Sequence, residues 1–129
     1  RWDKDFQPMI RKALDKNGAG ELDVVDIYNN ILAGTEVIWE VVDDQWNTVV
    51  VLTTVVIRYA EFKRWMQIAQ FASKPHTTTV WLKHLPELEQ YAKELEVKGI
   101  EIIGRKGWEK LMEPYGFKFR AIKLTKELA

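Results

Sequence analysis

The hydrophobic pattern at the start of the chain has the three-and-four spacing of helices that bury one face. One such segment runs from Asp5 to Leu14 and is followed by a glycine-containing stretch from Asp15 to Gly20. A second segment, from Asp23 to Leu32, is followed by Ala33 and Gly34, and glycine is the residue that commonly terminates a helix. We therefore expect two short helices.

The pattern then changes to the alternation of β-strands. The first alternating segment runs from Val37 to Val42, and a polar turn from Asp43 to Asn47 leads into Val49 to Tyr59, which is dense in valine, isoleucine and threonine. A third alternating segment spans Lys63 to Ala72. Its two faces are expected to hold Trp65, Gln67, Ala69 and Phe71 on one side and Arg64, Met66, Ile68 and Gln70 on the other. The three segments predict an antiparallel meander.

Helical spacing returns from Thr79 to Val97, where Pro86 should kink or restart the helix because proline lacks the N–H donor of a helix interior. Ile100 to Ile103 then predicts a buried strand, Lys106 to Met112 a short helix, and Phe117 to Leu124 a final strand. A meander followed by a strand–helix–strand crossover requires a mixed sheet with helices on both faces. The predicted fold class is therefore α/β (α+β), with a mixed, mostly antiparallel central sheet.

Composition narrows the class of protein. A length of 129 residues, 47% of them hydrophobic, predicts a single domain over residues 1–129. Nineteen basic and nineteen acidic residues give a net charge of zero, so we expect neither a nucleic-acid nor a membrane partner. There is no cysteine, no apolar run of membrane-spanning length and no signal-peptide core, so we expect a protein that is not secreted by a signal peptide.

The stretch from Gly99 to Phe117, with its strand, short helix and Gly116-Phe117 turn, resembles the closing half of a GNAT N-acetyltransferase. The predicted order of elements also matches the GNAT fold after its first strand, over nearly the whole chain. The resemblance implies a GNAT-like fold that lacks the first strand within these residues. The sequence Gly104-Arg-Lys-Gly-Trp108, together with Lys126-Glu-Leu128 at the end of the chain, most resembles GNAT-like proteins encoded by bacteriophages.

Several positions that the resemblance makes functional hold other residues here. Family members commonly carry an asparagine after the fifth strand, an alanine three residues on, and a Leu-Tyr pair shortly before the Gly-Phe turn. This chain has Arg105, Trp108 and Leu111-Met112 at those positions. The tyrosine that commonly protonates the departing CoA thiolate is thus Met112, and nearby Tyr115 is expected to face another way.

The resemblance also points to a phosphate-binding loop after the fourth strand of the family. In the family, glycines there let backbone N–H groups wrap the CoA pyrophosphate. This chain has no glycine between Gly34 and Gly99. The candidate phosphate ligands are instead Ser73, Lys74, Thr77, Thr78, Thr79 and Arg105. The alternative is that the three threonines only cap the following helix.

Candidate acid and base groups are few. A general base in this fold is commonly a carboxylate on the central strands, which here gives Glu40 and Glu61. Glu40 stands among Val, Ile and Trp, where burial would raise its pKa, but an outward-facing side chain is the favoured interpretation. His76, in the loop after the third strand, is a further candidate because imidazole titrates near neutral pH. His84 is expected to be a surface or boundary residue.

The segment from Asp15 to Asp26 matches several ligand positions of a calcium-binding EF-hand loop. Its fifth position is Ala19 and its last is Asp26 rather than glutamate, so a turn with polar helix caps is the favoured interpretation and no metal is predicted. Trp2 and Trp46, outside the predicted core, are candidate anchors for a protein partner or for self-association.

Two functional hypotheses follow from the resemblance. The first is a catalytically degenerate GNAT-fold protein without cofactor, acting as an internal virion, assembly or host-interaction component in the bacterial host cytoplasm or the phage particle. The alternative is an N-acetyltransferase that uses acetyl-CoA and an amine of unknown identity. The two differ in whether a CoA-sized cleft opens in the sheet or Trp65, Phe71 or Trp81 fills it.

Overall fold

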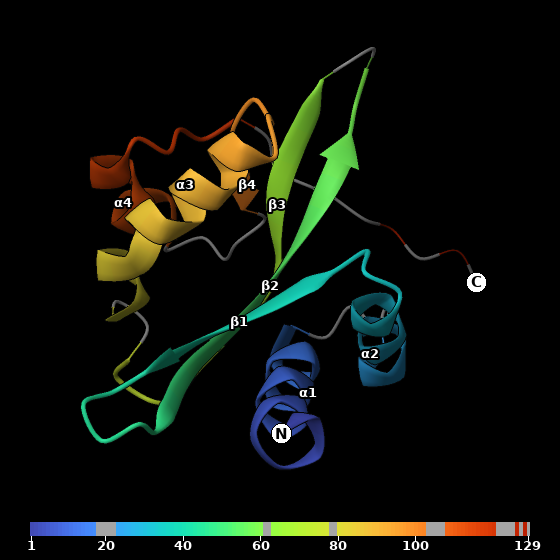
Figure 1. Cartoon of the computed structure of the whole chain (residues 1–129), viewed down its shortest axis with the longest axis vertical. Coiled ribbons are helices and arrows are strands. Elements are labelled where there is room, and N and C mark those ends of the chain that lie inside the picture. The colour runs from blue at the N-terminus through green and yellow to red at the C-terminus, as the bar shows by residue number, and fades with distance from the viewer. Residues whose placement is uncertain are drawn as a thin grey trace.

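The computed structural model describes residues 1–17, 23–60, 63–77, 80–102, 108–120, 126 and 128. Within them the chain forms one four-stranded sheet in the order β1-β2-β3-β4. Helices α1 and α2 cover one face of this sheet and α3 and α4 the other (Figure 1). The predicted α+β fold, with a mixed, mostly antiparallel sheet between helices, is confirmed.

The first two helices are short and amphipathic, as predicted. A π-helical turn at Trp2–Phe6 leads into α1 (Gln7–Asn17), and α2 spans Val24–Leu32. The Asp26 carboxylate accepts a hydrogen bond from the backbone N–H of Asp23 at 3.2 Å, which satisfies a free donor at the start of α2. The buried side chains of these helices meet the sheet in a small core of Ile10, Val24, Ile27 and Val51.

The three meander strands are also where the sequence predicts them. They are β1 (Val37–Val42), β2 (Thr48–Arg58) and β3 (Arg64–Ser73), and neighbouring strands pair antiparallel. The fourth strand, β4 (Ile100–Ile102), pairs parallel to β3. Parallel neighbours need a crossover connection, and here it is helical.

The crossover begins with a 3-10 turn at Val80–His84 and continues as α3 (Leu85–Glu94). Pro86 lies in the first turn of α3, so it restarts the helix rather than kinking it. The main core lies between this crossover and the sheet. Its buried members are Val41, Val49, Val50, Leu52, Met66, Ile68, Trp81, Leu82, Leu85, Leu88, Ala92 and Met112.

The faces predicted for β3 are wrong in its second half, because the strand contains a bulge. Thr54 pairs with Ile68 and Thr53 with Gln70, so one residue of β3, Ala69, is left without a partner. The extra residue reverses the alternation beyond it. Phe71 therefore packs against the same core as Ile68, although the regular pattern places these side chains on opposite faces.

After β4 the described chain continues with α4 (Trp108–Met112) and a 3-10 turn at Glu113–Tyr115. Gly116 ends this turn with a φ of 88°, a left-handed conformation that favours glycine. The predicted strand from Phe117 to Leu124 is wrong over residues 117–120, which belong to no strand, and its remainder lies outside the described residues. Phe117 packs against the main core, but Phe119, which would share its face in a strand, is 57% exposed.

None of the helices in the described part of the chain has both the length and the hydropathy needed to cross a membrane.

Candidate functional site

The described pairing of β3 with β4 ends next to an irregularity of β3. Met66 to Ile68 pair with Ile100 to Ile102, the last described residue of β4, and β3 continues beyond Ile68 to Ser73. The bulge at Ala69 lies immediately after the last described pair. Bulges are over-represented beside active sites because they redirect the strand and its side chains. We take this edge of β3 as the candidate site.

The bulge also determines which main-chain groups of β3 point away from β2. The N–H of Lys74 donates to the C=O of Val49 at 2.9 Å, so hydrogen-bonded pairs between β2 and this half of β3 fall at every second residue from Lys74. Phe71, opposite Leu52, is then in a non-hydrogen-bonded pair. Its N–H and C=O point away from β2, toward the side of β3 on which β4 pairs.

Aromatic rings form the wall of the site on the α3 and α4 side. The Phe71 ring centroid lies 4.8 Å from that of Trp108 and 5.4 Å from that of Trp81, and the two indoles are 6.0 Å apart. Trp81 is 1% exposed, and its indole N–H has no hydrogen-bond partner. Met112 is buried in the same core.

The opposite face of the site is polar. Ile100 and Ile102 pack into the main core, so Glu101 between them faces the α1 and α2 side of the sheet. The Tyr59 hydroxyl donates a hydrogen bond to Oε1 of Glu101 at 2.5 Å. This hydrogen bond, together with some burial, raises the pKa of Tyr59. Sequence reasoning missed Glu101, although a carboxylate between two isoleucines on a short strand was an available signal.

Glu40 is not part of this site. Nη1 and Nη2 of Arg1 donate to its two carboxylate oxygens at 2.5 Å each, and the Thr48 hydroxyl donates to Oε2 at 2.9 Å. The hydrogen bonds from Arg1 hold the pKa of Glu40 below its usual value and outweigh the rise that burial alone would cause. Glu40 is also on β1, separated from β3 by β2.

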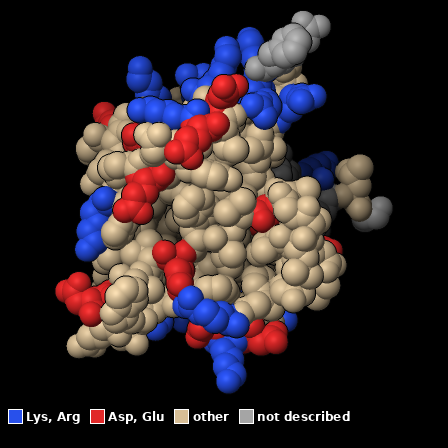
Figure 2. Space-filling view, viewed as in Figure 1, with Lys and Arg blue, Asp and Glu red and all other residues tan. Residues whose placement is uncertain are grey.

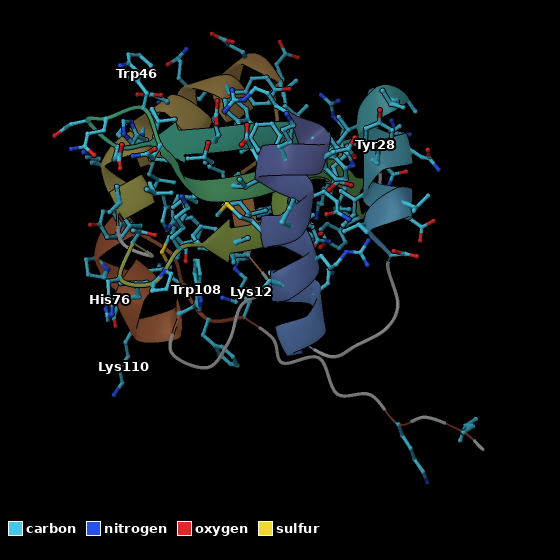
Figure 3. All side chains as sticks on the ribbon, turned by 90° about the horizontal axis from the view of Figure 1, so that it is seen from below. Lys12, Tyr28, Trp46, His76, Trp108 and Lys110 are labelled. Carbon is cyan, nitrogen blue, oxygen red and sulfur yellow. The ribbon has the colours of Figure 1, made fainter. Side chains whose placement is uncertain are left out.

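The loop after β3 combines a rigid turn with exposed side chains. The Thr77 hydroxyl is directed at main-chain carbonyl oxygens, 3.1 Å from that of Val49 and 2.6 Å from that of Lys74. It therefore stabilises the loop rather than pointing its donor at a ligand. Lys74 and His76 are exposed, and His76 has a φ of 63°. Figure 3 shows His76 at the same end of the molecule as Lys110 and α4.

The remaining predicted site residues divide into two groups. Ser73 is the last residue of β3 and lies beyond the bulge. The side chains of Glu61, Thr78, Thr79 and Arg105 lie outside the described residues.

No group of three or more His, Cys, Asp or Glu side chains within the described ranges has a metal-binding arrangement. Residues 18–22 of the calcium-like segment are outside the described residues. Asp26, the last position of the segment, is described and caps α2. His84 stands at the boundary between the 3-10 turn and α3, where its Nδ1 is 3.2 Å from the Glu87 carboxylate.

The two candidate anchor tryptophans differ in exposure. Trp46 is 83% exposed at the β1–β2 turn, and Figure 3 shows it projecting from the body of the molecule. Trp2 instead packs on Tyr28, with ring centroids 5.0 Å apart.

Figure 2 shows basic side chains gathered at the upper edge of the viewed face and acidic ones across its middle.

Comparison with solved structures identifies the fold. A predicted acetyltransferase from Clostridium acetobutylicum, solved with acetyl-CoA, gives a TM-score of 0.67 at 19% identity, over 91% of this chain and 83% of that one. The glucosamine-6-phosphate N-acetyltransferase of Arabidopsis thaliana gives 0.67 at 10% identity, over 95% and 91%. An aminoglycoside 6'-N-acetyltransferase from Acinetobacter baumannii gives 0.64 at 11% identity, over 91% and 89%.

These similarities establish a GNAT-like fold across most of the chain, and identities this low establish the fold alone. No protein-family model and no curated protein matches the sequence.

Proposed function

We propose that this protein is an N-acyltransferase that transfers the acetyl group of acetyl-CoA to an amine. We further infer that β3 and β4 diverge after Ile68 and leave an opening between them. Two observations carry this inference: the bulge at Ala69 directly follows the last described β3–β4 pair, and the main-chain groups of Phe71 point away from β2. The fold supports it, because the chain shares its architecture with acetyltransferases, one of them solved with acetyl-CoA.

The groups around the opening suit the parts of acetyl-CoA. The pantetheine arm is an extended chain with two amides, and a strand edge binds such chains through alternating main-chain hydrogen bonds. Phe71 offers one N–H and one C=O for this purpose. The buried indole N–H of Trp81 lacks a partner and suits a carbonyl oxygen. Lys74, exposed just after β3, suits the phosphates as a compact positive charge.

The proposed reaction needs little from the protein beyond position. The neutral amine nitrogen attacks the thioester carbonyl carbon, and the C–S bond breaks. Sulfur leaves as the CoA thiolate. The amine loses one proton, and protonation of the thiolate gives the free thiol of CoA. A donor aimed at the carbonyl oxygen stabilises the negative charge that develops there. Met112 cannot protonate the sulfur, so this protein would rely on solvent or another group for that proton.

A second candidate function is a GNAT-fold protein that catalyses no transfer. The packing of Phe71, Trp81 and Trp108 favours it, because these rings occupy the α3 and α4 side of the divergence. Exposed Trp46 would then anchor a protein partner. The virion, assembly or host-interaction role belongs to this candidate, although none of the three solved structures named above comes from a bacteriophage.

Amine-dependent release of CoA separates the two candidates. Purified protein is mixed with acetyl-CoA and a panel of primary amines, free thiol is measured with a chromogenic reagent, and products are weighed by mass spectrometry. The transferase predicts thiol release and an acetylated amine in equal amounts. Lys74→Met should raise the KM for acetyl-CoA several-fold with little change in kcat. Absence of both products with enzyme and acetyl-CoA at equal concentrations would favour the second candidate.

A further inference from the structure

We propose that the face of β4 opposite the aromatic wall binds the acceptor, and that the acceptor is a small molecule carrying both a primary amine and a carboxylate. Glu101, held by Tyr59, would take the amine, and Arg120, held on Trp65, would take the carboxylate. This inference rests on the proposed function, because it places the acceptor beside the divergence of β3 and β4.

The first part of this acceptor site is the Tyr59–Glu101 pair. Gln67 is the register partner of Glu101, and the bulge at Ala69 follows two residues later on β3. At about 3.3 Å per residue, that separation is within the length of a small acceptor. The Tyr59 hydroxyl engages only Oε1 in the described contacts, so Oε2 is available to an ammonium group. Tyr59 therefore acts as a positioning residue for the carboxylate.

The second part is the Trp65–Arg120 pair on the same face. A Cβ placed on Gly99 would lie 2.6 Å from Cζ3 of Trp65, so the indole covers the backbone of β4 just before Glu101. The guanidinium carbon of Arg120 lies 5.6 Å from the centre of the Trp65 rings. Stacking on an aromatic face leaves the edge of a guanidinium free for a carboxylate. No ion pair between Arg120 and an acidic side chain is found in the described part of the chain.

The chemistry of the two groups selects the acceptor. A carboxylate with a free oxygen binds an ammonium, and a stacked guanidinium binds a carboxylate, each through charge-assisted hydrogen bonds. Glu101 and Trp65, on which Arg120 stacks, lie on one face of the sheet. The Trp65 ring lies against Gly99, two residues before Glu101. A simple alkylamine uses only the first group. An amino acid uses both, and the second contact orients its amine toward the divergence.

Matched acceptors test the inference. β-Alanine and n-propylamine have nearly the same length and differ in the carboxylate. We expect kcat/KM for β-alanine to exceed that for n-propylamine by at least about tenfold, as one charge-assisted contact contributes. Arg120→Gln should abolish this preference by lowering kcat/KM for β-alanine to about that for n-propylamine. Glu101→Gln should raise the KM of both amines and leave the KM of acetyl-CoA unchanged. Equal kcat/KM values for the two amines would overturn the inference.

A binding measurement keeps the inference separate from the proposed function. Backbone NMR shifts are followed while β-alanine is added to wild-type protein without acetyl-CoA. Saturable shifts at Glu101 and Trp65 that disappear in Glu101→Gln support the acceptor site even if no transfer occurs. Tyr59→Phe, which keeps the ring and removes the hydroxyl, should weaken binding less than Glu101→Gln does. Absence of shifts in wild-type protein would overturn the site, whether or not the protein binds acetyl-CoA.

Discussion

Ile68 and Phe71 pack on the same face of β3 although an odd number of positions separates them. In a regular strand this spacing places side chains on opposite faces, and the bulge at Ala69 removes the conflict. The same bulge directly follows the last described β3–β4 pair. One extra residue therefore completes the aromatic wall and turns the main chain of Phe71 away from β2.

Deleting Ala69 should straighten β3 and keep Phe71 in the main core. Without the extra residue, Ile68 and Phe71 are two positions apart, and a regular strand then places both side chains on the same face. The deletion should therefore cost much less than Phe71→Ala, because truncating a core phenylalanine costs about 3–5 kcal/mol. Urea denaturation followed by tryptophan fluorescence compares the two variants. A loss as large as that of Phe71→Ala would contradict the description of Ala69 as the extra residue of a bulge.

Gly99 is needed for space rather than for its backbone conformation. A Cβ at this position would lie 2.6 Å from the Trp65 ring, so Gly99→Ala should lower the free energy of unfolding by about 1–3 kcal/mol. Trp65→Leu in the same chain should recover part of that loss. Gly116→Ala is the contrast, because nothing lies within 4 Å of its added Cβ and its φ of 88° alone makes alanine costly. If Trp65→Leu fails to rescue Gly99→Ala, the steric explanation is wrong.

The Arg1–Glu40 pair predicts a pH-dependent stability difference. The pKa of Glu40 is lower in the folded chain than in the unfolded chain, where it is about 4.3. Its contribution is therefore fully present above that pH and is lost as the pH falls through the lower, folded pKa. Glu40→Gln should lower Tm at pH 7 and match wild-type protein at pH 2.5. Because the pair is largely exposed, we expect a small shift, and a difference that persists unchanged at pH 2.5 would refute this origin.

Glu36 is a buried carboxyl group with incomplete hydrogen bonding. It is 5% exposed, Oε1 accepts a long hydrogen bond of 3.4 Å from the Asn30 side chain, and Oε2 has no partner. Replacing an under-partnered buried polar group by an apolar one of similar size is often neutral or stabilising. Glu36→Leu should therefore raise the free energy of unfolding by about 1 kcal/mol. Chemical denaturation checks this, and a loss of stability would show that the carboxylate has a partner in solution.

The sequence predicted the elements whose hydrophobic period is regular. The two N-terminal helices, the meander and the restart of the crossover helix at Pro86 all follow from local spacing and proline chemistry. The bulge at Ala69 was missed because neither Ala69 nor Gln70 is a glycine or another residue that marks a bulge. It is specified by packing on both faces of the sheet, which a single strand does not reveal.

The candidate site depended on contacts distant in sequence. The lowered pKa of Glu40 could not be predicted from local sequence because its partner, Arg1, lies 39 residues away. Glu101 was overlooked because Tyr59, which positions its carboxylate, is 42 residues away. Local sequence identifies a carboxylate on a strand, whereas its charge partner is known only once the strands and helices are assembled.

The most direct test is calorimetric titration of acetyl-CoA into wild-type protein, Phe71→Ala and Phe71→Pro. Both variants lose the ring, but only proline also removes the N–H that faces the opening, and this N–H makes no bond to β2. We expect saturable micromolar binding to wild-type protein and weaker binding to Phe71→Pro than to Phe71→Ala, with both variants shown to be folded by thermal melting. No heat with wild-type protein at millimolar acetyl-CoA would contradict the acyltransferase proposal.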